Sequence, residues 1–175
     1  GGGDDDHAYL GGVYEEQLME GATPPYSVYY SLGGKRVGLR RANQAGNNGQ
    51  YRLVGDQLGS TTVLIDTSST PQVVQRQYYA PYGQVAYQSG PATPLTSVVF
   101  TGQRLDSGSG LLYYGARYYD PALSYFISPD GIAPDKSKPQ SGDRYSYVLN
   151  NPLNRTDPTG HRACTSLPPA APASR

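Results

Sequence analysis

Short runs of apolar and aromatic residues, separated by polar turns, recur along the chain at the spacing of β-hairpins. In the clearest case, runs at residues 27–32 and 35–40 flank a two-residue loop, Gly33-Gly34. Further runs lie at 51–54, 61–66, 73–79, 84–88, 96–101 and 111–114. The segments between them are rich in Gly, Pro, Asp and Ser, which favour tight turns. The pattern predicts an all-β fold, a meander of short antiparallel hairpins.

A tyrosine-rich phrase recurs with variation at residues 78–85, 113–120 and 145–149. A repeat this short cannot bury its own face, so it needs stacked neighbours. The resulting sheet has open edge strands, which associate with other chains unless they are covered. We therefore expect upstream repeats of the same polypeptide to pair with this segment, and we expect the isolated fragment to fold poorly.

The pattern loosens after residue 125. A polar connector at 131–142 leads to residues 144–152, which have room for a single helical turn ended by Pro152. We expect this part to form an irregular C-terminal plug. Residues 1–8 and the Pro- and Ala-rich residues 162–175 are predicted to be disordered tails.

Composition excludes several classes of protein. The 175 residues indicate about one domain, and 22 Gly and 15 Pro leave little material for a helical bundle. The 14 Lys and Arg balance 14 Asp and Glu, so net charge draws the chain to neither nucleic acid nor an anionic membrane. No apolar run approaches the roughly 18 residues of a membrane span, and without an initiator Met the chain is expected to be a piece of a longer polypeptide.

Metal and cofactor sites are not predicted. Cys164 is the only cysteine, which excludes both an intrachain disulfide and a cysteine-ligated zinc site. His7 and His161 have no second ligand at metal-binding spacing. The 17 tyrosines, against 2 Phe and no Trp, supply rings that can be buried while each hydroxyl finds a partner.

Seven motifs occur in a fixed order along the chain. They are Gly-Asp-Gln-Leu-Gly-Ser at 55–60, Tyr-Ala-Pro-Tyr-Gly at 79–83, Phe-Thr-Gly-Gln-Arg at 100–104, Leu-Tyr-Tyr-Gly-Ala-Arg-Tyr-Tyr-Asp-Pro at 112–121, Phe-Ile-Ser-Pro-Asp at 126–130, Arg-Tyr-Ser-Tyr-Val-Leu-Asn-Asn-Pro at 144–152 and Asp-Pro-Thr-Gly at 157–160. Through these motifs, residues 9–161 resemble the RHS-repeat-associated core of the RHS/YD-repeat family.

The resemblance implies an architecture and a location. In that family, YD repeats wind a long β-sheet into a hollow shell, and the core closes one end. Residues 9–50 would then be terminal YD-repeat-like hairpins and residues 51–161 the core. The implied partners are upstream YD repeats and a C-terminal effector, often a toxin, which is cut from the core. The implied location is secreted or on the bacterial cell surface.

The resemblance also implies catalytic residues. Two aspartates of the family's core act as an intramolecular aspartyl-type peptidase, and the matching residues here are Asp130 and Asp157. Two carboxylates held close cannot both ionise, so one acts as acid while the other activates a water. The implied cleavage site is at Gly160 and His161, with the cut just after His161. Only residues 162–175 would be released, which are too few to form a toxin domain.

Three departures from the family pattern argue against activity. Gly131 stands where proline is usual, Ser-Tyr-Phe at 124–126 replaces Gly-Arg-Phe, and His161 replaces leucine or methionine. The arginine missing at Tyr125 would hold one carboxylate ionised. Arg117 and Arg144 are the candidates to replace its charge.

Three functions therefore stay open. The chain is a shell-closing module with latent self-cleavage, a purely structural or adhesion module, or a tyrosine-rich carbohydrate-binding module. In the structural alternative Asp130 and Asp157 are turn residues, since Pro-Asp-Gly and Asp-Pro-Thr-Gly are ordinary turn sequences.

Overall fold

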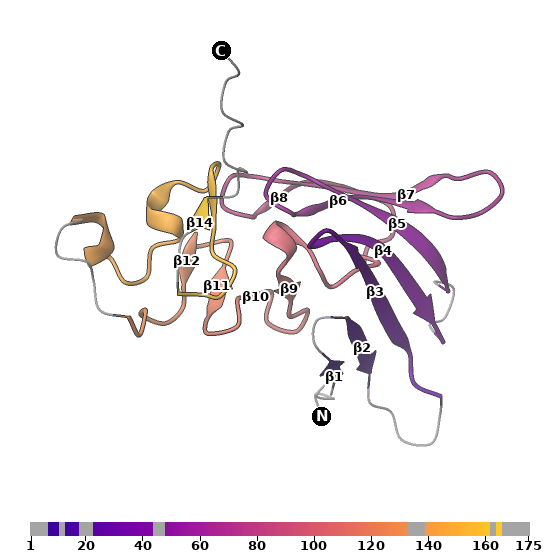
Figure 1. The fold of residues 1–175 in the computed structure, drawn as a ribbon, viewed down its shortest axis with the longest axis horizontal. Helices are drawn as coiled ribbons and strands as arrows, with labels where there is room; N and C mark the ends of the chain where they lie inside the picture. The colour runs from indigo at the N-terminus through magenta and orange to yellow at the C-terminus, as the bar shows by residue number, and fades with distance from the viewer. Residues whose placement is uncertain are drawn as a thin grey trace, which may run out of the picture. The chain divides into compact units, whose positions relative to one another are not determined.

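The computed structural model describes residues 7–10, 13–17, 23–43, 48–132, 139–161 and 164–165. These residues form three antiparallel sheets, of eight, four and two strands, with no α-helix among them (Figure 1). The predicted all-β fold is confirmed. Within the same residues there is also no helix whose length and hydropathy would suit a membrane crossing.

The eight-stranded sheet is a meander in which each strand pairs with the next in sequence. Its strands are β1 (His7–Leu10), β2 (Tyr14–Gln17), β3 (Tyr26–Leu32), β4 (Lys35–Ala42), β5 (Gly49–Gly55), β6 (Thr61–Asp66), β7 (Val73–Tyr79) and β8 (Val85–Ser89). Strands β3 to β8 cover the runs expected from the sequence, apart from one or two residues at some ends.

The β3–β4 hairpin has the predicted Gly-Gly turn. Gly33 and Gly34 have φ of +58° and +76°, and Leu32 faces Lys35 across the loop. Two successive positive φ angles suit the right-handed twist of paired strands, and glycine adopts them without a Cβ clash.

At the β1 edge of the sheet, residues 7 and 8 belong to a strand, so the expected disordered tail of residues 1–8 overlaps β1. Residues 1–6 of that expected tail lie outside the described residues.

One compact unit holds most of this sheet, and its core runs across neighbouring strands. Leu64 is buried between Leu53 on β5 and Gln75 on β7. The segment after β8 covers this face, because the Leu95 N–H donates to Gln75 Oε1 at 2.7 Å.

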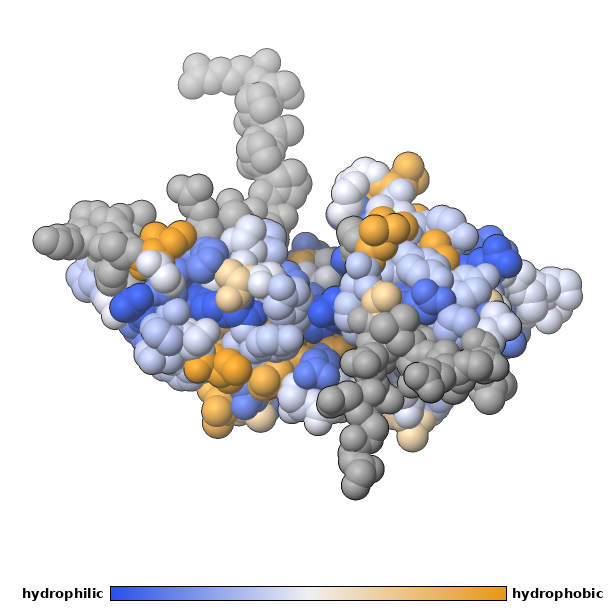
Figure 2. Space-filling view, turned by 90° about the horizontal axis from the view of Figure 1, so that it is seen from below, coloured by the Kyte–Doolittle hydropathy of each residue, from blue (hydrophilic) through white to orange (hydrophobic). Residues whose placement is uncertain are grey.

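On the molecular surface shown in Figure 2, exposed hydrophobic residues form small groups between polar ones, as on ordinary protein surfaces.

The predicted strand at 96–101 is wrong. Val98 makes one isolated bridge to Arg104, and a single 3-10 turn, η1 (Phe100–Gly102), follows. Thr101 has φ of +47°, which takes the chain out of the extended region. Residues 98–100 are buried in succession, whereas a half-buried strand buries alternate residues. The Val- and Thr-rich composition favoured a strand, but packing placed this run in the core.

The second compact unit is built around the four-stranded sheet. The strand order is β12 (Tyr125–Phe126), β11 (Tyr118–Asp120), β10 (Leu112–Tyr113) and β9 (Arg104–Leu105). Two short turns, η2 (Pro139–Gly142) and η3 (Val148–Asn150), and the strand pair β13 (Arg155–Thr156) and β14 (Cys164–Thr165) follow. Thus residues 164–165 of the expected tail 162–175 are paired, and the rest of it lies outside the described residues.

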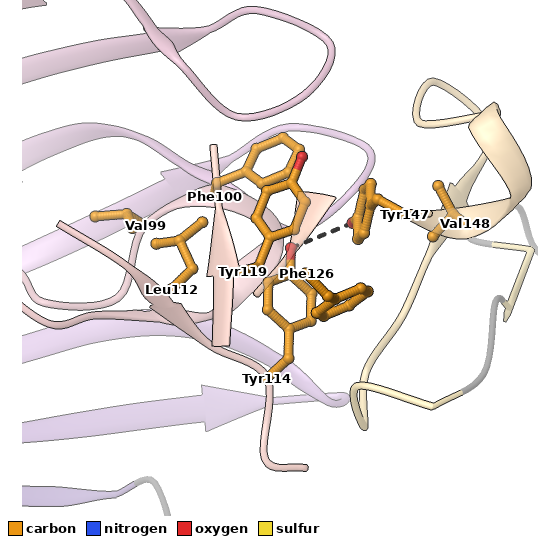
Figure 3. Packing of buried hydrophobic residues seen from close by; sticks show 8 residues of the cluster. All are labelled: Val99, Phe100, Leu112, Tyr114, Tyr119, Phe126, Tyr147 and Val148. Carbon is orange, nitrogen blue, oxygen red and sulfur yellow. Dashed lines mark hydrogen bonds between the residues drawn. The ribbon is translucent and has the colours of Figure 1, made fainter. Parts of the chain in front are cut away.

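An aromatic cluster fills the core of this unit (Figure 3). Its members are Val99, Phe100, Leu112, Tyr114, Tyr119, Phe126, Tyr147 and Val148. The ring centroids of Tyr119 and Tyr147 are 4.8 Å apart, and the Tyr114 hydroxyl lies 3.3 Å from that of Tyr147 and 2.8 Å from Thr101 Oγ1. Burial is the main reason why the pKa of Tyr114 is raised. Buried rings with partnered hydroxyls are what the tyrosine-rich composition predicted.

The predicted helical turn before Pro152 exists, but its hand is opposite to that of an ordinary helix. Val148, Leu149 and Asn150 have φ of +44°, +56° and +57°. Such angles are strained for a β-branched residue. Burial of Val148 in the aromatic cluster helps to hold the strained turn in place.

Candidate active site

Three separate segments of the second unit bring together the two predicted aspartates and one arginine. Arg117 lies in the turn between β10 and β11, Asp130 follows β12, and Asp157 follows β13. Arg117 Nη2 is 3.3 Å from Asp130 Oδ2 and 3.7 Å from Asp157 Oδ2. A single guanidinium nitrogen therefore lies near both carboxylates, although the two aspartates are far apart in sequence.

The Asp157 carboxylate builds the turn in which it lies. Its Oδ1 accepts backbone N–H bonds from Thr159 at 3.1 Å, Gly160 at 2.8 Å and His161 at 3.2 Å. Aspartate favours turns because its side chain can satisfy backbone donors in this way. The residue is 3% exposed. One oxygen of Asp157 thus has the turn-forming role of the structural alternative, while the other faces Arg117.

Arg117 is fixed by backbone carbonyls and by an aromatic ring. Its Nε donates to the Gly160 carbonyl, and its Nη1 donates to the Arg144 carbonyl at 2.9 Å. The guanidinium carbon lies 3.6 Å from the centroid of the Phe126 ring. Burial lowers the pKa of Arg117, and the charges of Asp130 and Asp157 oppose that effect. The side chain is an oriented cation and has little freedom to move.

Asp130 is the more accessible of the two carboxylates, with its side chain 17% exposed. Its Oδ1 accepts the Ile132 N–H at 2.9 Å and lies 2.8 Å from His161 Nδ1. Burial acts to raise the pKa of Asp130, but the Ile132 N–H, His161 and Arg117 outweigh it and hold the pKa below its ordinary value. The carboxylate is therefore kept ionised.

The arginine missing from position 125 is compensated. Arg117 carries the charge between the carboxylates, whereas Arg144 donates from Nε to the backbone carbonyl of Asp130 at 2.8 Å. The sequence offered both arginines and could not choose between them, because the choice depends on how the turn at 114–117 contacts the turn at 157–160. Of the two candidates to replace the charge missing at Tyr125, Arg117 is the one that lies beside both carboxylates.

Tyr147 connects the aromatic cluster to the site and was not singled out from the sequence. Burial, and to a smaller extent the negative charge of Asp157, raise the pKa of Tyr147, while a hydrogen bond with the Asp157 backbone acts in the opposite direction. The available signals were its positions within the 144–152 motif and within the tyrosine-rich phrase at 145–149. For the part of the chain that the structure describes, no group of three or more His, Cys, Asp or Glu side chains could hold a metal ion.

Comparison with known proteins gives a family match and several relatives. The family model described as Teneurin YD-shell matches residues 26–153. Salivary gland surface protein 1 of Aedes aegypti is 35% identical over 121 residues, which cover 68% of this chain and 3% of that protein. The probable deoxyribonuclease RhsA of Dickeya dadantii is 36% identical over 132 residues, which cover 67% of this chain and 8% of that protein. Toxin subunit YenC2 of Yersinia entomophaga is 33% identical over 116 residues, which cover 65% of this chain and 11% of that protein.

Solved structures show the same fold. A crystal structure of TcdB2-TccC3 without its hypervariable C-terminal region matches with a TM-score of 0.69 and 26% identity, covering 88% of this chain and 7% of that one. The TcdB2-TccC3-TEV structure matches with a TM-score of 0.70 and 25% identity, covering 88% of this chain and 8% of that one. The chain thus spans only 3% to 11% of the length of these relatives and solved chains.

Proposed function

Because the chain belongs to the RHS/YD-repeat family, in which it forms part of a YD-shell scaffold, we propose that Asp130, Asp157 and Arg117 cut its own backbone just after His161. In this proposal the chain is the RHS-repeat-associated core that closes the shell. Upstream YD repeats of the same polypeptide continue its sheet, and the peptide after His161 is the released product. The protein acts in a secreted or cell-surface setting.

The observation that carries the proposal is that the charged residues of the site bind the backbone of the turn at Gly160 and His161. Arg117 Nη2 lies near both carboxylates, Arg117 Nε holds the Gly160 carbonyl, and Asp157 Oδ1 holds the His161 N–H. The residue before the proposed cut, His161, also lies beside the more accessible carboxylate, because its Nδ1 is 2.8 Å from Asp130 Oδ1. Holding reacting groups in place is a large part of catalysis.

The proposed reaction is hydrolysis with Asp130 as base and then as acid. Asp130 takes a proton from water as the water oxygen attacks the His161 carbonyl carbon. The bond from that carbon to the next nitrogen then breaks, and Asp130 returns the proton to the leaving amine. Arg117 keeps Asp130 ionised before the attack, and Asp157 orients the segment. The guanidinium, more than a shared proton, offsets the repulsion between the carboxylates.

The test is the intact mass of the purified chain after incubation at mildly acidic and neutral pH. The parent is expected to lose residues 162–175, whereas Asp130→Asn and Asp157→Asn stay whole. The control is Asp120→Asn, whose carboxylate accepts the Ala122 N–H in a turn outside the site, and which is expected to cut like the parent. Near-UV circular dichroism reports whether each chain is folded. A folded parent that stays whole refutes self-cleavage.

A purely structural module is the second candidate. The observation that favours it is that Asp157 Oδ1 accepts three backbone N–H groups, an arrangement that a turn uses without any chemistry. In that case all chains stay whole, and Asp157→Asn only lowers the free energy of unfolding. The carbohydrate-binding hypothesis stays a prediction, which a glycan-array screen tests.

A further inference from the structure

His161 contacts both carboxylates of the candidate site. Its imidazole Nδ1 is 2.8 Å from Asp130 Oδ1, and its backbone N–H donates to Asp157 Oδ1 at 3.2 Å. The backbone contact is open to any residue except proline, but the side-chain contact needs a polar atom. Leucine or methionine, which the resemblance predicts at this position, cannot make it. The side-chain bond is therefore a property of this chain's own sequence.

A second departure from the family pattern lies beside the first. A Cβ added to Gly131 would lie 3.9 Å from His161 Cε1, in ordinary van der Waals contact with the ring. The imidazole thus packs next to the residue that follows Asp130. Gly131 and His161, noted separately in the sequence, form one local arrangement around the carboxylate.

Among the described residues, three other charged residues lie around the Asp130–His161 contact, and they come from different segments of the chain. Arg117 faces Asp130 from the β10–β11 turn, and Asp157 lies near the same guanidinium nitrogen. Arg144 faces the backbone carbonyl of Asp130 and not its carboxylate. The Asp130 carboxylate therefore has two side-chain donors, Arg117 and His161, of which only His161 belongs to the segment that would be cut.

We propose that His161 is a positioning residue, which donates a hydrogen bond from Nδ1 to Asp130 and so extends self-cleavage to lower pH than an apolar residue would allow. This inference rests on the proposed function. A donor to an ionised carboxylate makes protonation of that carboxylate harder. Asp130 stays available as a base in mild acid because the residue next to the cut supplies that donor.

Two substitutions separate the hydrogen bond from the imidazole charge. His161→Leu removes the donor, whereas His161→Asn places an amide N–H near the position of Nδ1 without a titrating ring. The acid half-point of the cleavage rate is expected to move up by about half a unit to one pH unit in His161→Leu. In His161→Asn the half-point is expected to stay within about 0.2 pH units of the parent value.

A second readout does not depend on cleavage. In chains that also carry Asp157→Asn and stay whole, carboxyl ¹³C NMR measures the pKa of Asp130 directly. This pKa is expected to be higher in the His161→Leu chain than in the chain that keeps His161 or in the His161→Asn chain. Equal Asp130 pKa values in all three overturn the role of His161, whether or not the parent is cut. If the folded parent stays whole but the pKa of Asp130 is still highest in the His161→Leu chain, the proposed function is overturned. The hydrogen bond by which His161 keeps Asp130 ionised is then still supported.

Discussion

Gly160 lies directly against Tyr114: a Cβ added to Gly160 would come within 2.9 Å of the Tyr114 carbonyl oxygen. Gly160 also has φ of +78°, which side-chain-bearing residues rarely adopt. Its carbonyl accepts the Arg117 Nε–H. The last residue of the Asp-Pro-Thr-Gly motif is thus the point at which the turn of Asp157 meets the turn of Arg117, and only glycine fits there.

Gly160→Ala is therefore expected to destabilise the fold and to disturb the site. The left-handed backbone alone costs about 1 to 2 kcal/mol for a residue with a Cβ. Separation of the two turns is expected to cost at least about 1 kcal/mol more. Gly110→Ala is the matched control, because Gly110 has φ of +74° but no atom within 4 Å of an added Cβ. Urea unfolding measures the free energy of unfolding of both variants. Equal losses in Gly160→Ala and Gly110→Ala would show that the close contact with Tyr114 contributes nothing.

Arg117 is expected to be the most costly cation to remove from the site. Arg117→Met leaves the buried Asp157 and the partly exposed Asp130 without their shared partner, and the expected loss is about 3 kcal/mol of unfolding free energy. Arg144→Met removes a more exposed guanidinium that binds a carbonyl, and it is expected to cost about 1 kcal/mol or less. Chemical denaturation checks both values. Similar losses would contradict the central position of Arg117.

The hairpins of this fold could be predicted because their signals are local. Gly33-Gly34 specifies its turn through two adjacent φ angles, and the strands on either side were found from their apolar runs. The β1–β2 hairpin has strands of only four residues, too short for a clear apolar run, and hairpins over residues 9–50 were expected only through the family resemblance. The 96–101 run was misjudged because burial by the core, which no local pattern shows, outweighed its strand-like composition.

The site could be predicted only in part. Asp130 and Asp157 were found through motif resemblance, but their shared neighbour Arg117 was one of two candidates. Which arginine lies between them depends on the contact of Gly160 with the 114–117 turn, and this contact joins segments far apart in sequence. The partner of His161 was not predictable for the same reason.

Ser124 gives a prediction about the departure at 124–126. It has φ of +64°, so it occupies a left-handed position where the family pattern has glycine. Ser124→Gly is expected to raise the free energy of unfolding by about 0.5 to 1 kcal/mol, because relief of strain exceeds the added entropy of the unfolded chain. Ser124→Ala keeps the Cβ and is expected to give no gain. Thermal unfolding of the two variants distinguishes them, and an equal response would assign the effect to the hydroxyl.

The lowered pKa of Asp130 predicts how stability depends on pH. A carboxyl with a lower pKa in the folded than in the unfolded chain stabilises the fold above its unfolded pKa of about 4. That contribution is lost as the pH falls through the folded pKa. At neutral pH, Asp130→Asn is expected to be less stable than the parent by about 2 kcal/mol, since charged hydrogen bonds to Ile132, His161 and Arg117 are weakened.

As the pH falls from about 5 to 2, the parent is expected to lose this advantage, because protonated Asp130 no longer pairs with Arg117. Urea unfolding of both chains at intervals of half a pH unit measures the difference. Both chains also carry Asp157→Asn, so that the proposed self-cleavage does not interfere with the measurement. The difference is expected to narrow throughout this range. A constant difference would mean that Asp130 stabilises the fold through its shape and neutral hydrogen bonds, and that its ionised form is not specifically held by the site.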